Sequence, residues 1–448
     1  MILTERTLSL PVPDAGTNLI EHLKNGTQFH LKSGDMPIRF VVSATEGNQF
    51  NCELGVIADA DDIMPSQDSL FEFRGRGSED ISCFNAVLLV PTGIGAEIGG
   101  HAGDATPIAN MLAQNCDKLI THPNVVNASD INEMADNMLY VEGSIISRML
   151  MGTVGLKEVR SNRVLFIIDD HPVQHFKDAA INSANAAKAT YGLDISEVVC
   201  VNPSIHMTAT YSESGRAIGE VTEIQDCLNY LIDKKDEYDA VAFSSVIKVP
   251  YEYHLEYFAK GGDMVNPWGG VEAILTHATS TILNVPTAHA PMFENKEIEN
   301  LETGVVDPRM SAEAVSMCFI QCVLKGLKNS PGLVTEPSEI SRKDIISAEN
   351  VSCLIIPDGC IGLPTLAALY QNIPVIAVRE NKNKMRNDLS NLPWTKGQLI
   401  YVESYLEAAG VMSALKAGIA IDSVKRPLNS VKVTHVELEA SQAAKLLS

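Results

Sequence analysis

A glycine-rich segment between Thr92 and Asp104 holds the first residues that could do chemistry. Five of its thirteen residues are glycine, which lets the backbone take positive φ angles and expose amide N–H groups. Amides exposed in this way, beside the start of a helix, bind anions. The sequence therefore predicts a ligand-binding loop formed by Thr92, Gly93, Gly95, Gly99 and Gly100. The alternative is a tight turn that only lets a strand and a helix pack closely.

Two titratable residues of this loop, His101 and Asp104, lie three positions apart. Together they could orient a general base or ligate a metal ion. They could equally be a helix-capping aspartate and a histidine that takes no part. Both residues are catalytic candidates, and both interpretations stay open.

A second polar turn, residues 121–127, follows the next apolar run of the chain. Ligands of open α/β sheets bind outside the carboxyl ends of the strands, so we expect this turn to face the same crevice as the glycine-rich loop. His122 is the strongest candidate for an acid–base residue, and Thr121, Asn124 and Asn127 are candidates for ligand binding. Ordinary turn chemistry is the alternative for the asparagines.

A third segment, residues 261–272, is a long polar loop with four glycines and a tryptophan, and it leads into a helix. Loops of this composition are costly to order and usually line a site. Glu272 is its catalytic candidate, and Asn266 and His277 are ligand-binding candidates. A loop that merely connects two domains is the alternative.

A fourth turn surrounds Cys360, where an apolar strand runs into a helix. Helix amides lower the pKa of a thiol in that position, although the nearby Asp358 opposes the effect. Cys360 is therefore a candidate nucleophile. In the alternative interpretation, this turn and the strand end near position 380 form a second ligand cradle from Asp358, Gly359, Gly362, Glu380 and Asn381.

The loops leave the cofactor unknown but disfavour a nicotinamide. The strand after the glycine-rich loop ends in Thr121 and His122 rather than in the acidic residue that binds a ribose hydroxyl. No Lys or Arg occurs between Gly77 and Cys116 to meet a pyrophosphate. A divalent metal fits the carboxylates and histidines of residues 169–175, but an N-capping aspartate with solvated histidines is the favoured interpretation of that run.

The composition excludes some classes of binding partner and predicts the cellular compartment. The net charge is −22, and no Lys- or Arg-rich run is present, which argues against nucleic acid and against anionic membranes. No apolar run approaches the roughly 20 residues that span a bilayer, and the N-terminus does not resemble a signal peptide. Nine scattered cysteines indicate free thiols in a reducing compartment. These features predict a cytoplasmic protein.

Alternating strands and helices predict an α/β fold with mostly parallel sheets. Helix starts are expected at two capping-box patterns, Thr222 with Gln225 and Ser404 with Glu407. We expect a β-rich N-terminal module at 1–85, two α/β units at 86–245 and 246–430, and a tail at 431–448. The expected strands are 38–42, 52–57, 70–73, 86–90, 118–121, 164–168, 198–201, 240–243, 353–356 and 375–378.

A faint internal repeat suggests how the two units are arranged. Residues 88–94 (LLVPTGI) resemble residues 354–360 (LIIPDGC), and each run is followed by a helix rich in alanine and leucine. Two matching strand–helix units predict two Rossmann-like halves that face each other across a cleft, where a ligand binds.

Five segments together resemble a family of unknown function, DUF3326, which occurs in cyanobacteria, other bacteria and plastid-bearing eukaryotes. The resemblance extends over about residues 86–430, implies one continuous functional unit that includes Glu142, and supplies no activity. The segments are VPTGIGAEIGGHAGDA (90–105), LITHPNVVNA (119–128), YVEGS (140–144), NPWGGVEA (266–273) and IPVIAVREN (373–381).

The sequence supports three functional hypotheses. The first is an enzyme of hydrolase, lyase or isomerase type that acts on a small polar or anionic metabolite in a cleft. The second is a protein that senses a metabolite or serves in assembly through the same pocket without turnover. The third is a metal-dependent hydrolase. A homo-oligomer is compatible with all three.

Overall fold

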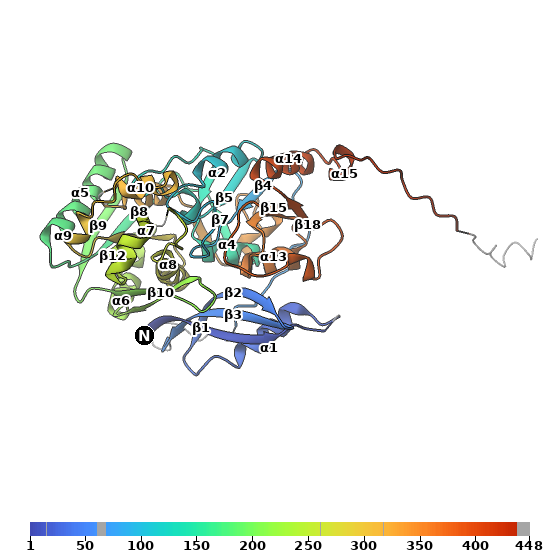
Figure 1. The fold of residues 1–448 in the computed structure, drawn as a ribbon. Coiled ribbons are helices and arrows are strands. Elements are labelled where there is room, and N and C mark those ends of the chain that lie inside the picture. The colour runs from blue at the N-terminus through green and yellow to red at the C-terminus, as the bar shows by residue number, and fades with distance from the viewer. Residues whose placement is uncertain (15, 61–68, 260, 317, 437–448) are drawn as a thin grey trace, which may run out of the picture.

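The computed structural model describes residues 1–436 except 15, 61–68, 260 and 317 (Figure 1). Its described part is a mixed α/β fold with two large sheets, so the predicted class is confirmed. The predicted tail at 431–448 is described only as far as residue 436, and residues 437–448 lie outside the described part.

One sheet has six strands and is parallel throughout, in the order β18-β17-β15-β4-β5-β6. Short runs of Val, Ile and Leu form these strands because both faces of the sheet are covered and buried. The strands are β4 (Asn85–Leu88), β5 (Lys118–Thr121), β6 (Met138–Tyr140), β15 (Val351–Pro357), β17 (Val375–Val378) and β18 (Leu399–Val402). The helices that follow these strands in the chain are α2 (Thr106–Ala113), α3 (Pro123–Val126), α4 (Gly143–Leu150), α13 (Leu363–Gln371) and α14 (Tyr405–Lys416).

The other sheet has ten strands and is mixed. Its parallel part contains β8 (Arg163–Asp169), β9 (Asp194–Val201), β12 (Ala240–Lys248) and β13 (Thr287–Met292). Its antiparallel part contains β1 (Ile2–Pro11), β2 (Met36–Glu46), β3 (Gln49–Ala58), β10 (His206–Tyr211), β11 (Ala217–Thr222) and β16 (Ile361–Gly362). The helices near it are α1 (Leu19–Gln28), α5 (Gln174–Tyr191), α6 (Gln225–Asp233), α7 (Tyr251–Ala259) and α8 (Gly269–Leu283).

Shorter elements complete the described chain. They are α9 (Lys296–Glu299), α10 (Ser311–Ala314), α11 (Gln321–Leu327), α12 (Pro337–Ile340), α15 (Ile421–Val424) and the antiparallel pair β7 (Gly155–Lys157) and β14 (Gly332–Val334). Helix α14 begins as predicted, because Ser404 caps it through the amide of Glu407. Helix α6 lacks the predicted cap, since Ile224 occupies the cap position.

The N-terminal strands β1 to β3 lie against the remainder of the molecule (Figure 1). Strand β1 pairs with β11 through Leu3 and Val221, so these strands continue the ten-stranded sheet. The strand predicted at 70–73 is wrong, because these residues have no strand conformation. Their aromatic side chains pack on the body instead, for example Phe71 on Phe40.

The repeated units are neighbours rather than opposite halves. Strands β4 and β15, which carry the matching runs, pair in parallel in one sheet. That sheet takes its strands from residues 85–140 and 351–402, and thus from both predicted units. The two sheets therefore do not form two separate Rossmann-like halves. The similarity of two βα units in the sequence does not decide which sheet each of them joins.

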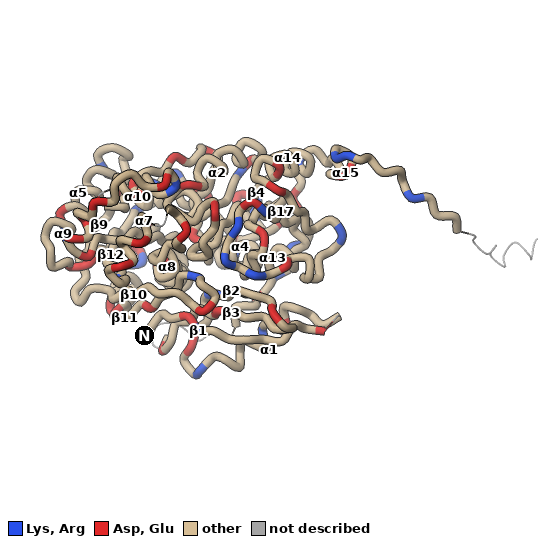
Figure 2. The backbone as a smooth tube through the Cα atoms, in the orientation of Figure 1, with Lys and Arg blue, Asp and Glu red and all other residues tan. Residues whose placement is uncertain are grey.

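Acidic and basic residues are interspersed along most of the described chain. Figure 2 shows Asp and Glu in the N-terminal strands and in the body, with Lys and Arg scattered among them. All nine cysteines are free thiols. Across the described residues, no helix combines the length and apolar character that crossing a bilayer requires.

Candidate functional site

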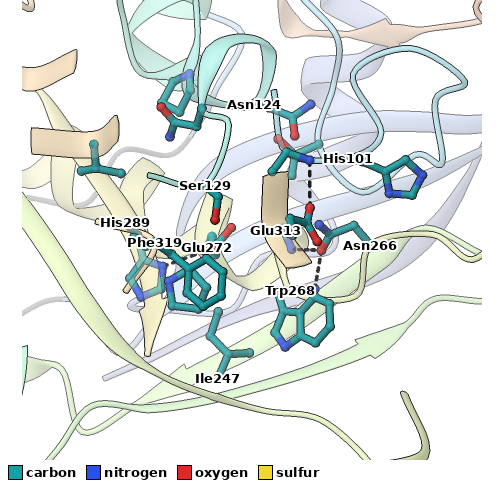
Figure 3. Close-up of a pocket in the computed structure, with 18 of the residues that line it drawn as sticks. His101, Asn124, Ser129, Ile247, Asn266, Trp268, Glu272, His289, Glu313 and Phe319 are labelled. Carbon is teal, nitrogen blue, oxygen red and sulfur yellow. Dashed lines mark hydrogen bonds and ion pairs between the residues drawn. The ribbon is translucent and has the colours of Figure 1, made fainter. Parts of the chain in front are cut away.

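A cavity of about 290 Å³ lies between the two sheets. The loops after β4, β5 and β6 supply one wall, and β13, the end of β12 and helix α8 supply another. The segment around α10 and α11 closes it. The carboxyl ends of parallel strands meet here, which is the usual location of ligand sites in α/β folds. Figure 3 shows the polar and aromatic side chains that surround this space.

Most of the candidates from the first three loops line this cavity. From the glycine-rich loop and the turn after β5 they are Thr92, Gly93, Gly100, His101, His122, Asn124 and Asn127. From the start of α4 and from the loop and helix after α7 they are Glu142, Asn266, Glu272 and His277. The sheet order places β4, β5 and β6 side by side, so the loops after them form one wall, and residues 266–277, more than a hundred positions further along the chain, line the same cavity.

Two amides of the glycine-rich loop are hydrogen-bonded to protein side chains and are therefore not free to bind an anion. The amide of Gly99 donates to Oδ1 of Asp104 at 2.9 Å, and the amide of Ile98 donates to Oδ1 of Asn381 at 2.9 Å. Gly99 has a φ of +82°, and a Cβ there would lie 2.9 Å from Val90. The prediction that the amides from Gly93 to Gly100 all face a ligand is therefore wrong for this part of the loop. Only its two ends reach the cavity.

The side chains of His101 and Asp104 have different hydrogen-bond partners. Nδ1 of His101 lies 2.9 Å from the hydroxyl of Tyr257, whereas Asp104 accepts the Gly99 amide inside the loop. Burial raises the pKa of Asp104 to about 6 and lowers the pKa of His101. Asp104 is not a helix cap either, because Ala105 occupies the cap position of α2 without a side-chain bond.

His122 is a buried, neutral imidazole. Its Nε2 accepts the amide of Val90 at 3.2 Å, which leaves the ring proton on Nδ1. Burial lowers the pKa of His122 to about 4, although Glu142 acts in the opposite direction. A neutral ring with a fixed Nδ1–H is suited to donate a hydrogen bond rather than to take a proton.

We expect His122 to stay neutral from about pH 5 to 8, unlike a solvated histidine. The depressed pKa also means that the fold loses stability as pH falls from 6.5 towards 4, because only the unfolded chain takes up the proton in that window. Nitrogen-15 NMR of the imidazoles, assigned with a His122→Asn variant, measures the charge and the tautomer. An imidazolium signal at pH 6 would contradict the assignment.

Glu142 and His277 contact each other in the wall of the cavity. Nδ1 of His277 lies 2.5 Å from Oε1 of Glu142, and the other carboxylate oxygen accepts the Ser144 amide at 2.9 Å. Burial raises the pKa of Glu142, but the charge and hydrogen bond of His277 and the hydrogen bonds of Ser144 outweigh it and lower the pKa to about 2. This carboxylate stays charged and holds His277 in place.

A second pair is formed by Glu272 and His289, and the imidazole of His289 also contacts the hydroxyl of a serine. Nδ1 of His289 lies 3.0 Å from Oε1 of Glu272, and Nε2 lies 2.8 Å from Oγ of Ser245. The order resembles the Ser-His-acid triads of hydrolases. Ser245, however, is 2% exposed and does not line the cavity. The hydroxyl therefore orients the imidazole from behind, and Glu272 and His289 are the members that line the ligand space.

Glu313 of α10 is the carboxyl with the most unusual environment in the cavity. Its Oε1 accepts the Ala102 amide at 2.8 Å and the Tyr257 hydroxyl at 3.2 Å. Burial raises the pKa of Glu313 to about 7, with Glu272 and Asp104 contributing in the same direction. A carboxyl that titrates near neutral pH beside an open cavity is suited to general acid–base catalysis.

Two polar atoms of the cavity wall have no partner. They are Oγ of Ser129 and Nε2 of His254, whose ring packs on Trp268 with 5.4 Å between the centroids. Buried polar atoms are nearly always hydrogen-bonded in a complete structure. The apolar surfaces of Trp268 and Phe319 flank the same space (Figure 3). Unpaired polar groups among apolar walls are typical of a ligand site.

The candidates of the fourth turn and of the strand end near position 380 lie outside this cavity for a topological reason. Strands β15 and β17 occupy the other half of the six-stranded sheet, so the loops after them open elsewhere. Cys360 and Gly362 line a second cavity. Burial raises the pKa of the Cys360 thiol far above its usual range, which opposes the predicted nucleophile. The other candidates that do not line the main cavity are Gly95, Gly99, Asp104, Thr121, Asp358, Gly359, Glu380 and Asn381.

These outlying residues mainly brace loops. Asn381 holds Ile98, Glu380 accepts the Tyr405 amide at 2.8 Å, and the hydroxyl of Thr121 donates to the Leu88 carbonyl at 2.9 Å. No group of three or more His, Cys, Asp or Glu side chains among the described residues is arranged to hold a metal ion. His101 and Asp104 therefore lack further described ligands for the metal-binding alternative.

Several cavity residues were not among the sequence candidates. His289 carried a weak signal, as a polar residue inside the apolar strand β13, and so did Ser245 of β12, which contacts His289 from outside the cavity wall. Glu313 carried none, because α10 is a four-residue helix of ordinary composition. Glu313 is half-buried, and its raised pKa arises from desolvation by loops that are distant in the sequence.

Comparison with known proteins places the chain in a family. Residues 85–425 match the sequence profile of a family described as "Protein of unknown function (DUF3326)". The chain belongs to the DUF3326 family. An uncharacterized lipoprotein of Synechococcus sp. (strain ATCC 27144 / PCC 6301 / SAUG 1402/1) is 32% identical over 339 residues, which is 75% of this chain and 91% of that protein. No solved structure matches the chain significantly.

The DUF3326 match confirms the family predicted from the sequence segments. It begins at β4 and leaves β1 to β3 outside, as the resemblance implied. Four of the five segments that carry the resemblance, those at 90–105, 119–128, 140–144 and 266–273, contribute residues to the cavity wall. The fifth, at 373–381, supports the glycine-rich loop through Asn381.

Proposed function

We propose that this protein is an enzyme that transfers protons on a small polar or anionic metabolite bound in the main cavity. The reaction is of lyase, isomerase or hydrolase type. The observation that carries the proposal is Glu313, a carboxyl whose pKa is raised to about 7 by burial at the cavity wall. A group that titrates near 7 can both take and return a proton at neutral pH.

The roles of the neighbouring groups follow from their contacts. Oε1 of Glu313 is held by Ala102 and Tyr257, so Oε2 is the oxygen that accepts the proton. The pair of Glu272 and His289 supplies a second acid–base group in the same cavity. His122, with its proton on Nδ1, donates a hydrogen bond to a polar group of the ligand.

A direct nucleophile has less support in this cavity. The Ser245 hydroxyl lies behind His289, and the Cys360 thiol stays protonated. In the hydrolase variant, water activated by Glu313 would therefore be the attacking group. The free thiols support a proposed cytoplasmic location for this chemistry.

Hydrogen exchange into mixtures of metabolites tests the proposal and can identify the substrate at the same time. Pools of small polar and acidic metabolites are incubated with the protein in D₂O and followed by proton NMR and mass spectrometry. We expect one compound to gain deuterium at carbon or to be converted, because proton abstraction is the first step of the proposed chemistry.

The same experiment separates an enzyme from a sensor. A compound that raises the melting temperature but undergoes neither exchange nor conversion would favour the metabolite-sensing alternative. If the double variant His289→Asn, Glu313→Gln exchanged deuterium into the compound as fast as the wild type, the exchange would come from a contaminating enzyme. Either result would remove the support for an enzyme.

A further inference from the structure

A second cavity of about 110 Å³ adjoins the main one where the N-terminal strands meet the body. Thr92, His122, Gly143, Ala273 and His277 line both cavities. Since a water molecule takes up about 30 Å³ in the liquid, the second space is large enough for a carboxylate or phosphate group. One small molecule can therefore extend from the main cavity into the second.

Two arginines distinguish the second cavity from the first. Arg39 of β2 and Arg216, which directly precedes β11, both contribute to its wall. Among its described lining residues there is no Asp or Glu. Guanidinium N–H groups in a wall without a described carboxylate are suited to hydrogen-bond a carboxylate or a phosphate.

Both guanidinium groups are held from one side and leave donors unused on the other. Arg216 donates from Nε to Glu53 and from Nη2 to Glu5, whereas its buried Nη1 has no partner. Arg39 donates from Nη1 to Oε1 of Glu5 at 3.1 Å, its one hydrogen bond in the described part of the chain. Arg216 is 0% exposed, so bulk water does not satisfy the remaining N–H groups.

The start of helix α13 adds further donors. Strand β16 pairs with β2 through Gly362 and Val41, which pins this helix start beside the strand of Arg39. No side chain caps the first amides of α13, unlike those of α4, which the Glu142 carboxylate occupies. Ser144, Ser147 and Thr365 also line this wall, but their hydroxyls already donate to protein acceptors, so the free donors are the helix amides and the two guanidinium groups.

We infer that the second cavity binds the anionic group, a carboxylate or a phosphate, of the small molecule whose reacting part occupies the main cavity. This inference rests on the proposed function, because it assigns the charged group of that enzyme's substrate. Glu5 and Glu53 neutralise the two arginines, so the attraction comes from oriented N–H donors rather than from excess positive charge. Free inorganic anions should therefore bind with modest affinity.

Titration of the full-length protein with inorganic phosphate, and separately with malonate, tests this assignment at constant ionic strength by isothermal calorimetry. We expect saturable binding of one anion per chain. Arg39→Gln removes unused donors and should weaken binding at least about tenfold. Ser147→Leu fills the cavity and provides a second variant with a similar expected loss. Arg379→Gln, which changes an exposed arginine of the surface pair with Glu403, is the matched control and should bind like the wild type.

The outcomes distinguish a phosphate ligand from a carboxylate ligand, and they distinguish failure of the proposed function from failure of this inference. Binding of phosphate alone indicates a phosphate ester, and binding of malonate alone indicates a carboxylic acid. Glu313→Gln should bind the anion like the wild type, so anion binding without any metabolite exchange would contradict the proposed function while still showing that the second cavity is an anion site. Absence of saturable binding, or equal binding by Arg39→Gln, Ser147→Leu and the wild type, would show that the second cavity holds only water.

Discussion

Replacing Glu313 by glutamine should slow proton exchange on the substrate by at least about 100-fold. Glutamine keeps the shape of the side chain and an oxygen that accepts the Ala102 amide, so the cavity should stay folded. What the variant lacks is a group that can bind and release a proton. The wild-type rate should rise with pH and level off above about 7, because ionised Glu313 is the proton acceptor. The variant should show no such inflection.

A stability measurement checks the same residue without a substrate. Burial raises the pKa of Glu313 from 4.5 to about 7, so the folded state holds a proton that the unfolded state releases. The stability that this proton contributes is complete below pH 4.5 and is lost as pH rises towards 7. Relative to the wild type, Glu313→Gln should therefore gain stability across this window.

The matched control is Glu339→Gln, an exposed carboxylate of α12 that lies outside both cavities. Its exchange rate and its stability at each pH should follow the wild type. A Glu313→Gln variant with wild-type exchange and an unchanged pH profile would refute the assignment of the proton acceptor.

Replacing Arg216 by methionine should destabilise the protein by about 3–5 kcal/mol. Arg216 is fully buried and bonds two carboxylates, Glu5 of β1 and Glu53 of β3. Removing it leaves buried negative charge without its main partner, which costs far more than the loss of a surface ion pair. Urea unfolding of the full chain, followed by tryptophan fluorescence and circular dichroism, measures the change.

The pH dependence supplies an internal check on this prediction. Burial raises the pKa of Glu53, but the charge of Arg216 and hydrogen bonds from Ser212, Ser214 and Arg216 outweigh burial and lower the pKa below 4.5. The stability from this lowered pKa is present above pH 4.5 and is lost as pH falls below it. The difference between wild type and Arg216→Met should therefore shrink in acid.

Two further variants define what the loss means. Arg163→Met breaks an exposed pair with Asp239 and should have little effect, because solvent screens that pair. Arg216→Met combined with Glu53→Met should recover part of the loss, since it removes one unpaired carboxylate. If Arg216→Met were as stable as Arg163→Met, the ion pairs of Arg216 with Glu5 and Glu53 would not stabilise the packing of the N-terminal strands on the rest of the molecule.

The sequence by itself determined the local elements and the loops. Strands β5 and β17 have the predicted bounds, and Ser404 caps α14, because apolar runs and capping side chains act over a few residues. Glycine-rich and polar turns marked three of the segments that line the cavity, since such turns follow strand ends and strand ends are where α/β folds bind ligands.

Only the tertiary structure decided which of those side chains are free to act. The amides of the glycine-rich loop are occupied by partners such as Asn381, which is 283 positions from Ile98. Glu313, the Ser245–His289 contact and the pairing of Arg39 and Arg216 with distant glutamates arise from sheet order and burial. A local pattern cannot encode these features, because desolvation and long-range pairing depend on what the fold places around a residue rather than on its neighbours in the chain.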